Sequence, residues 1–187
     1  MAVKGTISYR FTKVTAKMMA AVLVTGATLF TFARPETAWF IPGAIITFFG
    51  EALRIWAAGH LRKNKQLTTS GPYAYVKNPL YLGTFLITLG GSVMAKSVFI
   101  MLAGFAWLIL YYVPYKKKQE SRKLHECFGD AWVEYDKVVP DYLPLRTPYA
   151  RKGTNGWSFA VVKENSEHET AAGVVLGSLV LLYMLIR

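Results

Sequence analysis

Apolar residues along this chain gather in five long blocks that are separated by short polar connections. Each block is close to the roughly 20 helical residues that cross the hydrocarbon core of a bilayer. The blocks show neither the alternation of a half-buried strand nor the one-sided stripe of a soluble helix. The pattern therefore predicts an all-α fold, an integral membrane bundle of about five transmembrane helices. The predicted spans are Thr15–Ala33, Ala38–Ala58, Leu80–Ala95, Ser97–Tyr115 and Ala171–Ile186.

The last of these blocks has two interpretations. Ala171–Ile186 is short, contains Gly173 and Gly177, and follows a polar run. It is either a full span or an interfacial or re-entrant helix. In either case its small residues would permit close packing on a neighbouring helix.

Residues 116–139 are polar, yet they predict a helical extension of the fourth span into the cytoplasm. Gly129-Asp130 interrupts this extension as a helix stop followed by a new cap, and Pro140 ends it. The apolar stripe that supports it recurs every three or four residues and consists of Leu124, Phe128, Trp132 and Tyr135.

The charge of the chain follows the predicted topology. The formal net charge is +11, and 53% of the 187 residues are hydrophobic. With the amino terminus in the cytoplasm, 18 of the 22 Lys and Arg residues fall in cytoplasmic segments, whereas Arg34, Lys96 and Arg187 lie on the other side. This asymmetry is the positive-inside pattern, and it explains the basicity without a nucleic-acid partner. It also places the sizeable polar segments, 59–79 and 116–170, on the cytoplasmic face.

Length and cysteine content narrow the class further. A chain of 187 residues fits one membrane domain, 1–187, and its single cysteine, Cys127, excludes an internal disulfide. The sequence has no Cys/His cluster with metal-ligand spacing, so we expect no metal site. We interpret the first apolar block as a retained span rather than a cleaved signal.

The most informative stretch lies at residues 71–83. Asn78 before Pro79 favours a helix start, because proline suits the first helical position and asparagine is a good cap. The free N–H groups of that helix start, together with Lys77, would attract a carboxylate or phosphate. The alternative is an ordinary membrane-interface cap, with the nearby tyrosines in the aromatic belt.

This stretch resembles the isoprenylcysteine carboxyl methyltransferase and phospholipid methyltransferase superfamily, and the resemblance covers about residues 45–145. Residues 146–187 form a carboxy-terminal polar segment and the last membrane helix. The superfamily has Arg-His where this chain has Lys77-Asn78, and Glu-Glu where it has Gln119-Glu120. The matching residues are Gly71-Pro72-Tyr73, Pro79-x-Tyr81-x-Gly83, Glu120, Phe128-Gly129-Asp130-Ala131-Trp132-x-x-Tyr135 and Val139-Pro140.

The resemblance implies a methyltransferase that uses S-adenosylmethionine, with its cofactor site facing the cytoplasm of a bacterial inner membrane. The cofactor carboxylate would lie at the start of the third span, its ammonium near Glu120, and its adenine against Tyr73 or Tyr81. The acceptor would be a membrane lipid or a prenylated substrate: an isoprenylcysteine carboxylate, a phospholipid headgroup or another isoprenoid lipid. The predicted cofactor-binding residues are Tyr73, Lys77, Asn78, Pro79, Tyr81, Gly83, Gln119 and Glu120.

A second cluster supplies the candidate catalytic residues Glu51, Arg54 and His60. Glu51 and Arg54 are one helical turn apart and can pair. Charges within a span usually face a protein interior or a wet cavity, although Arg54 could also extend towards headgroups as part of a structural pair. His60 could bind cofactor, act as a base, or be an interfacial side chain.

Two other functions fit the same residues. One is a membrane oxidoreductase of the sterol-reductase type, which would bind a nicotinamide cofactor. The other is a non-catalytic, methyltransferase-like membrane subunit that binds a partner or a lipid, as the Lys77-Asn78 and Gln119 departures suggest.

Overall fold

The computed structural model describes residues 28, 31–63, 65–150, 153 and 155–187, which contain helices and no strand. Most of the predicted first span, Thr15–Ala33, lies outside these residues. The helical elements are α2 (Thr37–His60), η1 (Gly71–Ala74), α3 (Pro79–Met94), α4 (Val98–Trp107), η2 (Leu108–Tyr112), α5 (Val113–Phe128), α6 (Asp130–Val138), α7 (Phe159–Glu164) and α8 (Glu167–Ile186).

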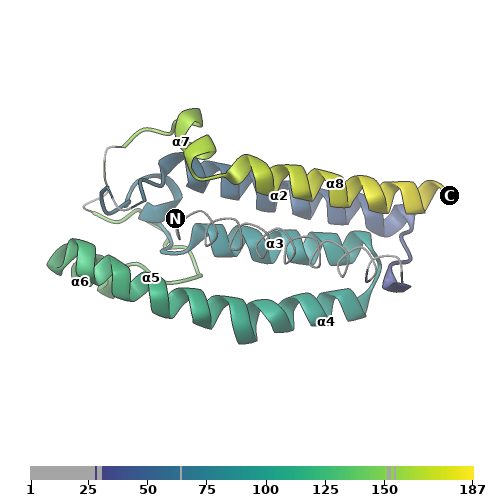
Figure 1. Ribbon diagram of the computed structural model, residues 1–187, viewed down its shortest axis with the longest axis horizontal. Helices are drawn as coiled ribbons and strands as arrows, with labels where there is room; N and C mark the ends of the chain where they lie inside the picture. Colours follow the sequence, from purple (N-terminus) through teal and green to yellow (C-terminus); the bar gives the residue numbers. More distant parts are fainter. Residues whose placement is uncertain (1–27, 29–30, 64, 151–152, 154) are drawn as a thin grey trace, which may run out of the picture.

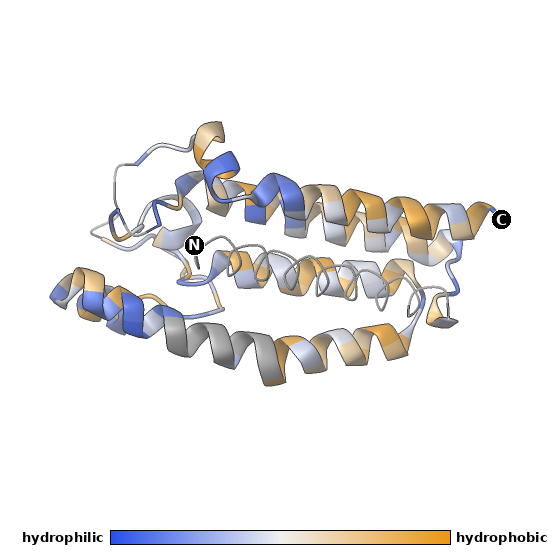
Figure 2. Cartoon of the chain, viewed as in Figure 1, coloured by the Kyte–Doolittle hydropathy of each residue, from blue (hydrophilic) through white to orange (hydrophobic). Residues whose placement is uncertain are grey.

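The long helices lie lengthwise beside one another, and the chain reverses direction from each to the next (Figure 1). Hydrophilic residues concentrate at the end that carries α6 and α7, and hydrophobic residues dominate the rest of α2, α4 and α8 (Figure 2). At the opposite end, the Arg34 N–H donates to the Ala95 carbonyl (2.8 Å) and Lys96 pairs with Glu36. Successive long helices thus run in opposite directions, and their orientation in a membrane stays a prediction.

Two helices, α2 and α8, are long and apolar enough to cross a membrane. Helix α8 begins at Glu167 rather than Ala171 and has 20 residues. It is therefore long enough for a full span. The apolar segments Pro79–Met94 and Val98–Leu110 are shorter. The described part of the chain is all-helical, as predicted, with two helices that could cross a membrane, while the count of five spans stays a prediction.

Glycines bring α2 and α3 into close contact. Gly43 lies against the Gly90 carbonyl, and Gly50 lies against the Gly83 carbonyl, with a Cβ built on either α2 glycine 2.6 or 2.9 Å from that oxygen. The two glycines on each helix are seven residues apart, which places them on one face. Small residues permit this close backbone approach in membrane helices. The contact fixes the start of α3 relative to the polar end of α2.

The fourth apolar block continues into a cytoplasmic helix, as the stripe in residues 116–139 predicts. Helices α4, η2 and α5 follow one another without a break, η2 being a π-helical turn, and α5 ends at Phe128. Gly129 has a φ of +50°, a conformation that glycine adopts without strain, and α6 starts after it. Helix α6 and the segment after it form a buried cluster of Trp132, Tyr135, Val139 and Tyr149.

Residues 155–165 cap the polar end of α2, a role the sequence analysis did not predict. The Ser158 N–H donates to the Gly59 carbonyl (3.1 Å), and the Asn165 side chain donates to the carbonyls of Ala58 and Leu61 (both 2.9 Å). The last carbonyls of a helix have no intrahelical partner, so these contacts stabilise the end of α2. They also place α8 beside α2.

Candidate functional site

The family-like stretch forms a tight loop that residues 140–149 wrap from one side. The Lys77 N–H donates to the Pro140 carbonyl (2.9 Å), the Leu145 N–H to the Tyr75 carbonyl (2.9 Å), and the Tyr149 N–H to the Ala74 carbonyl (2.8 Å). Buried backbone groups require such partners. The loop therefore reaches the start of α3 in a fixed conformation.

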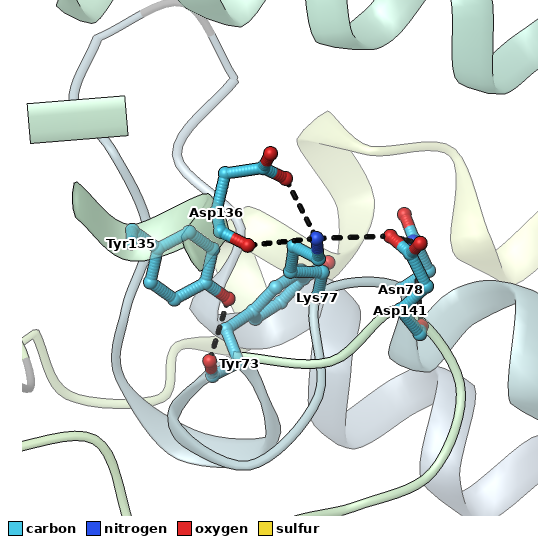
Figure 3. Close-up of polar contacts among 6 residues, drawn as sticks. All are labelled: Tyr73, Lys77, Asn78, Tyr135, Asp136 and Asp141. Atoms are coloured by element: carbon cyan, nitrogen blue, oxygen red, sulfur yellow. Dashed lines mark hydrogen bonds and ion pairs between the residues drawn. The ribbon is translucent and has the colours of Figure 1, made fainter. Parts of the chain in front are cut away.

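Lys77 is surrounded by acceptors from α6 and from this wrapping segment (Figure 3). Its Nζ lies 2.6 Å from Asp136 Oδ1 and 3.2 Å from Asp141 Oδ1, and it also donates to the Asp136 carbonyl (3.2 Å). Asn78 stands at the N-cap position of α3, but its side-chain amide donates to the Asp141 carbonyl (3.3 Å) and makes no capping bond. Pro79 occupies the first helical position, as predicted. An internal carboxylate, Asp141, thus contacts both residues where we expect the cofactor carboxylate.

Tyr81 and Glu120 meet, although 39 residues separate them in the sequence. The buried Tyr81 hydroxyl donates to Glu120 Oε2 at 2.5 Å, while the rest of Glu120 is exposed. Helix α3 presents the hydroxyl, and α5 presents the carboxylate. The side chain of Gln119 lies outside the described residues, so its predicted contribution stays a prediction.

Tyr73 belongs to the loop that precedes α3 and is buried, with 7% of its surface exposed. Burial raises the pKa of its hydroxyl above the usual value, and the nearby Tyr135, Glu120 and Glu167 raise it further, whereas Arg54 lowers it. The Tyr135 hydroxyl donates to the Tyr73 carbonyl (2.7 Å; Figure 3). Tyr73 is therefore a neutral phenol at physiological pH, close to several charged groups.

The Arg54 side chain extends from α2 to the start of α3 and the start of α8. Its Nε donates to Glu167 Oε1 at 2.6 Å, and its Nη1 donates to Thr84 Oγ1 (2.6 Å) and to the Leu80 carbonyl (3.2 Å). Gly83, predicted to bind cofactor, lies against the Arg54 stem, where a Cβ would come within 2.4 Å of Cγ. The structure thus brings the second sequence cluster beside the start of α3.

Glu51 and Arg54 do not form the ion pair that their spacing allows. Arg54 pairs with Glu167 instead, and both carboxylate oxygens of Glu51 are buried without a hydrogen-bond partner among the described residues. Spacing along one helix permits the local pair, but the start of α8 supplies a carboxylate in a better position. The carbon atoms of Glu51 line an apolar hollow of about 430 Å³ beside Trp56 and Trp157.

His60 is buried at the end of α2 and is held on one nitrogen. Its Nδ1 lies 3.1 Å from Ser70 Oγ and 3.0 Å from the Asn155 carbonyl. Gly71 packs on the ring with a φ of +58°, and a Cβ there would come within 2.4 Å of Cδ2. These contacts give His60 a structural environment, and its role in binding or catalysis stays a prediction.

Sequence reasoning missed three acidic residues near the site: Asp136, Asp141 and Glu167. All three lie far along the chain from the groups they contact, and none belongs to a motif matched in the sequence. One feature of the sequence points to Glu167, namely its position just before an apolar block. A carboxylate at the edge of a membrane span suggests a functional site.

Comparison with known families agrees with this geometry. A family model described as phospholipid methyltransferase matches residues 44–131. The matched region includes the contact of Gly50 with Gly83, the loop at 71–78, and both Tyr81 and Glu120. Residues 44–131 thus resemble the phospholipid methyltransferases, and relatives named isoprenylcysteine O-methyltransferase match the same region, as the motifs of the chain predicted.

Individual relatives support the same assignment. The chain is 28% identical over 151 residues to the cobalt-zinc-cadmium resistance protein CzcN of Cupriavidus metallidurans, a match that covers 76% of this chain and 68% of that protein. It is 31% identical over 117 residues to the protein-S-isoprenylcysteine O-methyltransferase of Homo sapiens. This match covers 56% of this chain and 41% of the human protein. The protein of the same name from Schizosaccharomyces pombe is 30% identical over 96 residues, covering 51% of this chain and 40% of the relative. The chain thus spans about two fifths of the length of these methyltransferases, and no solved structure gives a significant match.

Proposed function

We propose that this protein transfers a methyl group from S-adenosylmethionine to a membrane-resident acceptor, with the reaction centred where α3 begins beside α5. The observation that carries the proposal is the Tyr81–Glu120 contact inside the family-matched region. It brings an exposed carboxylate to the predicted cofactor site, at the polar end of an otherwise apolar bundle (Figure 2).

The residues present fit the cofactor in part. Glu120 has a free carboxylate edge for the cofactor ammonium, because Oε2 alone is hydrogen-bonded to Tyr81 among the described residues. The positive amino-terminal end of α3 suits the cofactor carboxylate. The Asp141 carboxylate already contacts Lys77 and Asn78 there, so it competes with the cofactor carboxylate for these two residues. When bound, S-adenosylmethionine supplies an activated methyl group on a sulfonium.

The contribution of the protein to such a reaction is chiefly positioning. Methyl transfer is an in-line displacement, so holding the acceptor in line and excluding water supplies much of the rate. Arg54 is held by three hydrogen-bond acceptors beside the start of α3, and we assign its positive charge to binding the methyl acceptor. A carboxylate acceptor needs no base near neutral pH, whereas an amine must lose a proton. Glu51 and His60 are the candidates for accepting it.

The acceptor class follows from the setting. Several relatives are named protein-S-isoprenylcysteine O-methyltransferase, and the matching family model is described as phospholipid methyltransferase. We propose a lipid or prenylated acceptor that approaches within the bilayer. The charge pattern supports a bacterial cytoplasmic membrane with the amino terminus inside. The comparisons do not favour the nicotinamide-dependent or non-catalytic alternatives.

Two measurements on the detergent-solubilised full chain test the proposal. Calorimetric titration with S-adenosylmethionine should show binding that weakens at least tenfold in Glu120→Gln, because the ammonium loses its counter-charge. The control Glu126→Gln, on the exposed face of α5, should bind as the wild type does. Labelled-methyl transfer is then measured with S-farnesyl-N-acetylcysteine and with phosphatidylethanolamine vesicles. Absence of S-adenosylmethionine binding, or of transfer to both acceptors, would overturn the proposal.

A further inference from the structure

We propose that Glu167, the first residue of α8, is a positioning residue for methyl transfer and acts by orienting Arg54. The inference rests on the proposed function and extends it to a helix beyond the family-matched region, which ends at residue 131. It makes the carboxy-terminal helix part of the site rather than only an additional span.

The contact between these residues is short and shielded from water. Glu167 Oε1 lies 2.6 Å from Arg54 Nε, and their side chains are 5% and 13% exposed. Thr84 and the Leu80 carbonyl accept from Nη1, so two helices hold one guanidinium: α8 through Glu167, and α3 through a side chain and a backbone carbonyl. Nη2 makes no hydrogen bond to any residue that the structure describes and is left for a ligand.

The bundle leaves space for this arrangement. Gly83 packs against the arginine stem, where a side chain would collide with Cγ at 2.4 Å and with the Gly50 carbonyl at 2.8 Å. Arg54 can cross between α2 and α3 only because that position is a glycine. The guanidinium therefore has a path, two acceptors on α3 and a counter-charge on α8.

A structural role alone explains this ion pair poorly. Removing two charges from water costs about as much as their attraction returns, so an apolar pair would hold α2 and α8 together at least as well. Charges at membrane depth are rare and usually serve binding or transport. A second carboxylate, Glu51, lies one turn away on α2 and remains without a described partner. Arg54 therefore pairs with a carboxylate on α8 rather than with the carboxylate on its own helix.

The pair also lies beside the rest of the site. Arg54 donates to Leu80 and Thr84 in the first turns of α3, and between them lies Tyr81, whose hydroxyl donates to Glu120. Glu120 serves the cofactor side of this region, and Arg54 serves the acceptor side. A change in the orientation of Arg54 should therefore alter methyl transfer more than cofactor binding.

The experiment compares Glu167→Gln with Glu169→Gln in the full chain. Both variants remove one charge from the first turn of α8, but Glu169 is exposed and makes no contact with Arg54. We measure the Kd for S-adenosylmethionine, and kcat and KM for whichever of the two acceptor probes the wild type methylates. Glu167→Gln should lower kcat/KM for the acceptor on the order of 100-fold, the effect of misplacing a reacting group by about 1 Å, and leave the Kd within about twofold. Glu167→Asp should recover part of the loss.

The outcomes separate this inference from the proposed function. Equal kcat/KM in Glu167→Gln and Glu169→Gln would overturn the positioning role. A parallel loss of cofactor binding and thermal stability in Glu167→Gln, without recovery in Glu167→Asp, would assign the pair to folding and would also overturn it. A wild-type chain that neither binds S-adenosylmethionine nor methylates either probe would overturn the proposed function itself.

Discussion

The Tyr81 hydroxyl donates a 2.5 Å hydrogen bond to Glu120, and this contact joins the start of α3 to the cytoplasmic extension of the following helix. Tyr81 is 6% exposed, so its hydroxyl has little access to water and depends on this partner. The bond fixes one oxygen of the carboxylate and leaves the other for a cationic group. It connects the two parts of the family motif that the sequence separates by a helical hairpin.

Replacing Tyr81 by phenylalanine should weaken cofactor binding without unfolding the protein. The ring that packs at the start of α3 remains, but Glu120 loses a charge-assisted bond worth about 1.5–3 kcal/mol. The Kd for S-adenosylmethionine should rise roughly tenfold or more in calorimetric titration. An unchanged Kd in Tyr81→Phe, at an unchanged melting temperature, would show that Glu120 needs no such orientation.

A substitution at Gly83 should separate the helix pair from the site. In Gly83→Ala the new methyl group meets Arg54 Cγ at 2.4 Å and the Gly50 carbonyl at 2.8 Å, so the backbones must move apart. We expect a loss of about 1–3 kcal/mol of stability, as for other overpacked contacts. Gly91→Ala, on the same helix, is the control, because a Cβ there meets nothing within 4 Å. Thermal melts in detergent should separate the two variants, and equal melting temperatures would contradict the close contact.

The alkaline stability of the fold should depend on Tyr73. Burial raises the pKa of its hydroxyl above the unfolded value of about 10, so the folded chain keeps a proton that the unfolded chain releases. The resulting stability is fully present below pH 10 and is lost as pH rises beyond it, by up to about 1.4 kcal/mol per pH unit. Tyr73→Phe should flatten the decline of melting temperature between pH 9 and pH 11.

Tyr183→Phe provides the matched control for that measurement. Tyr183 is 57% exposed on α8, so its removal should leave the alkaline decline as in the wild type. Lysines also lose their charge in this pH range, and both variants share that contribution. A decline in Tyr73→Phe as steep as in Tyr183→Phe would contradict the buried phenol.

The apolar blocks and the family motif predicted where several helices start and stop, and one contact at the candidate site. The start of α3 at Pro79, the helix that continues past the fourth block, and the stop at Gly129 follow from local rules of capping and periodicity. The proximity of Tyr81 to Glu120 followed from the hairpin between them. These features depend on neighbours that the sequence places close together, or on a pattern shared by the family.

Long-range polar contacts could not be predicted in the same way. Spacing allowed Glu51 to pair with Arg54, but the competing carboxylate of Glu167 is 113 residues from Arg54 and reaches it only through the packing of α8 on α2. Likewise, no local rule places Asp141 beside Lys77, since residues 140–149 must first wrap the loop. Both contacts arise from tertiary structure, and both changed the expected chemistry of the site.

The charge of Asp141 gives a direct test of where the cofactor carboxylate binds. Asp141 Oδ1 lies 3.2 Å from Lys77 Nζ and 3.4 Å from the Asn78 amide, where that carboxylate is expected. Asp141→Asn removes a like charge a few ångströms away, worth about 1 kcal/mol in a partly exposed setting. The Kd for S-adenosylmethionine should therefore fall roughly fivefold. The melting temperature should drop only slightly, because Lys77 keeps its ion pair with Asp136 after Asp141 loses its charge.

A control at Asp130 completes this test. Asp130 is exposed at the start of α6, so Asp130→Asn changes the net charge equally without touching Lys77. Tighter binding in Asp141→Asn alone would locate the carboxylate at the start of α3. The effect should also diminish above about 0.5 M salt, since screening weakens interactions between partly exposed charges. Weaker binding in Asp141→Asn would mean that the aspartate holds Lys77 in place for another purpose, and that the cofactor carboxylate binds elsewhere.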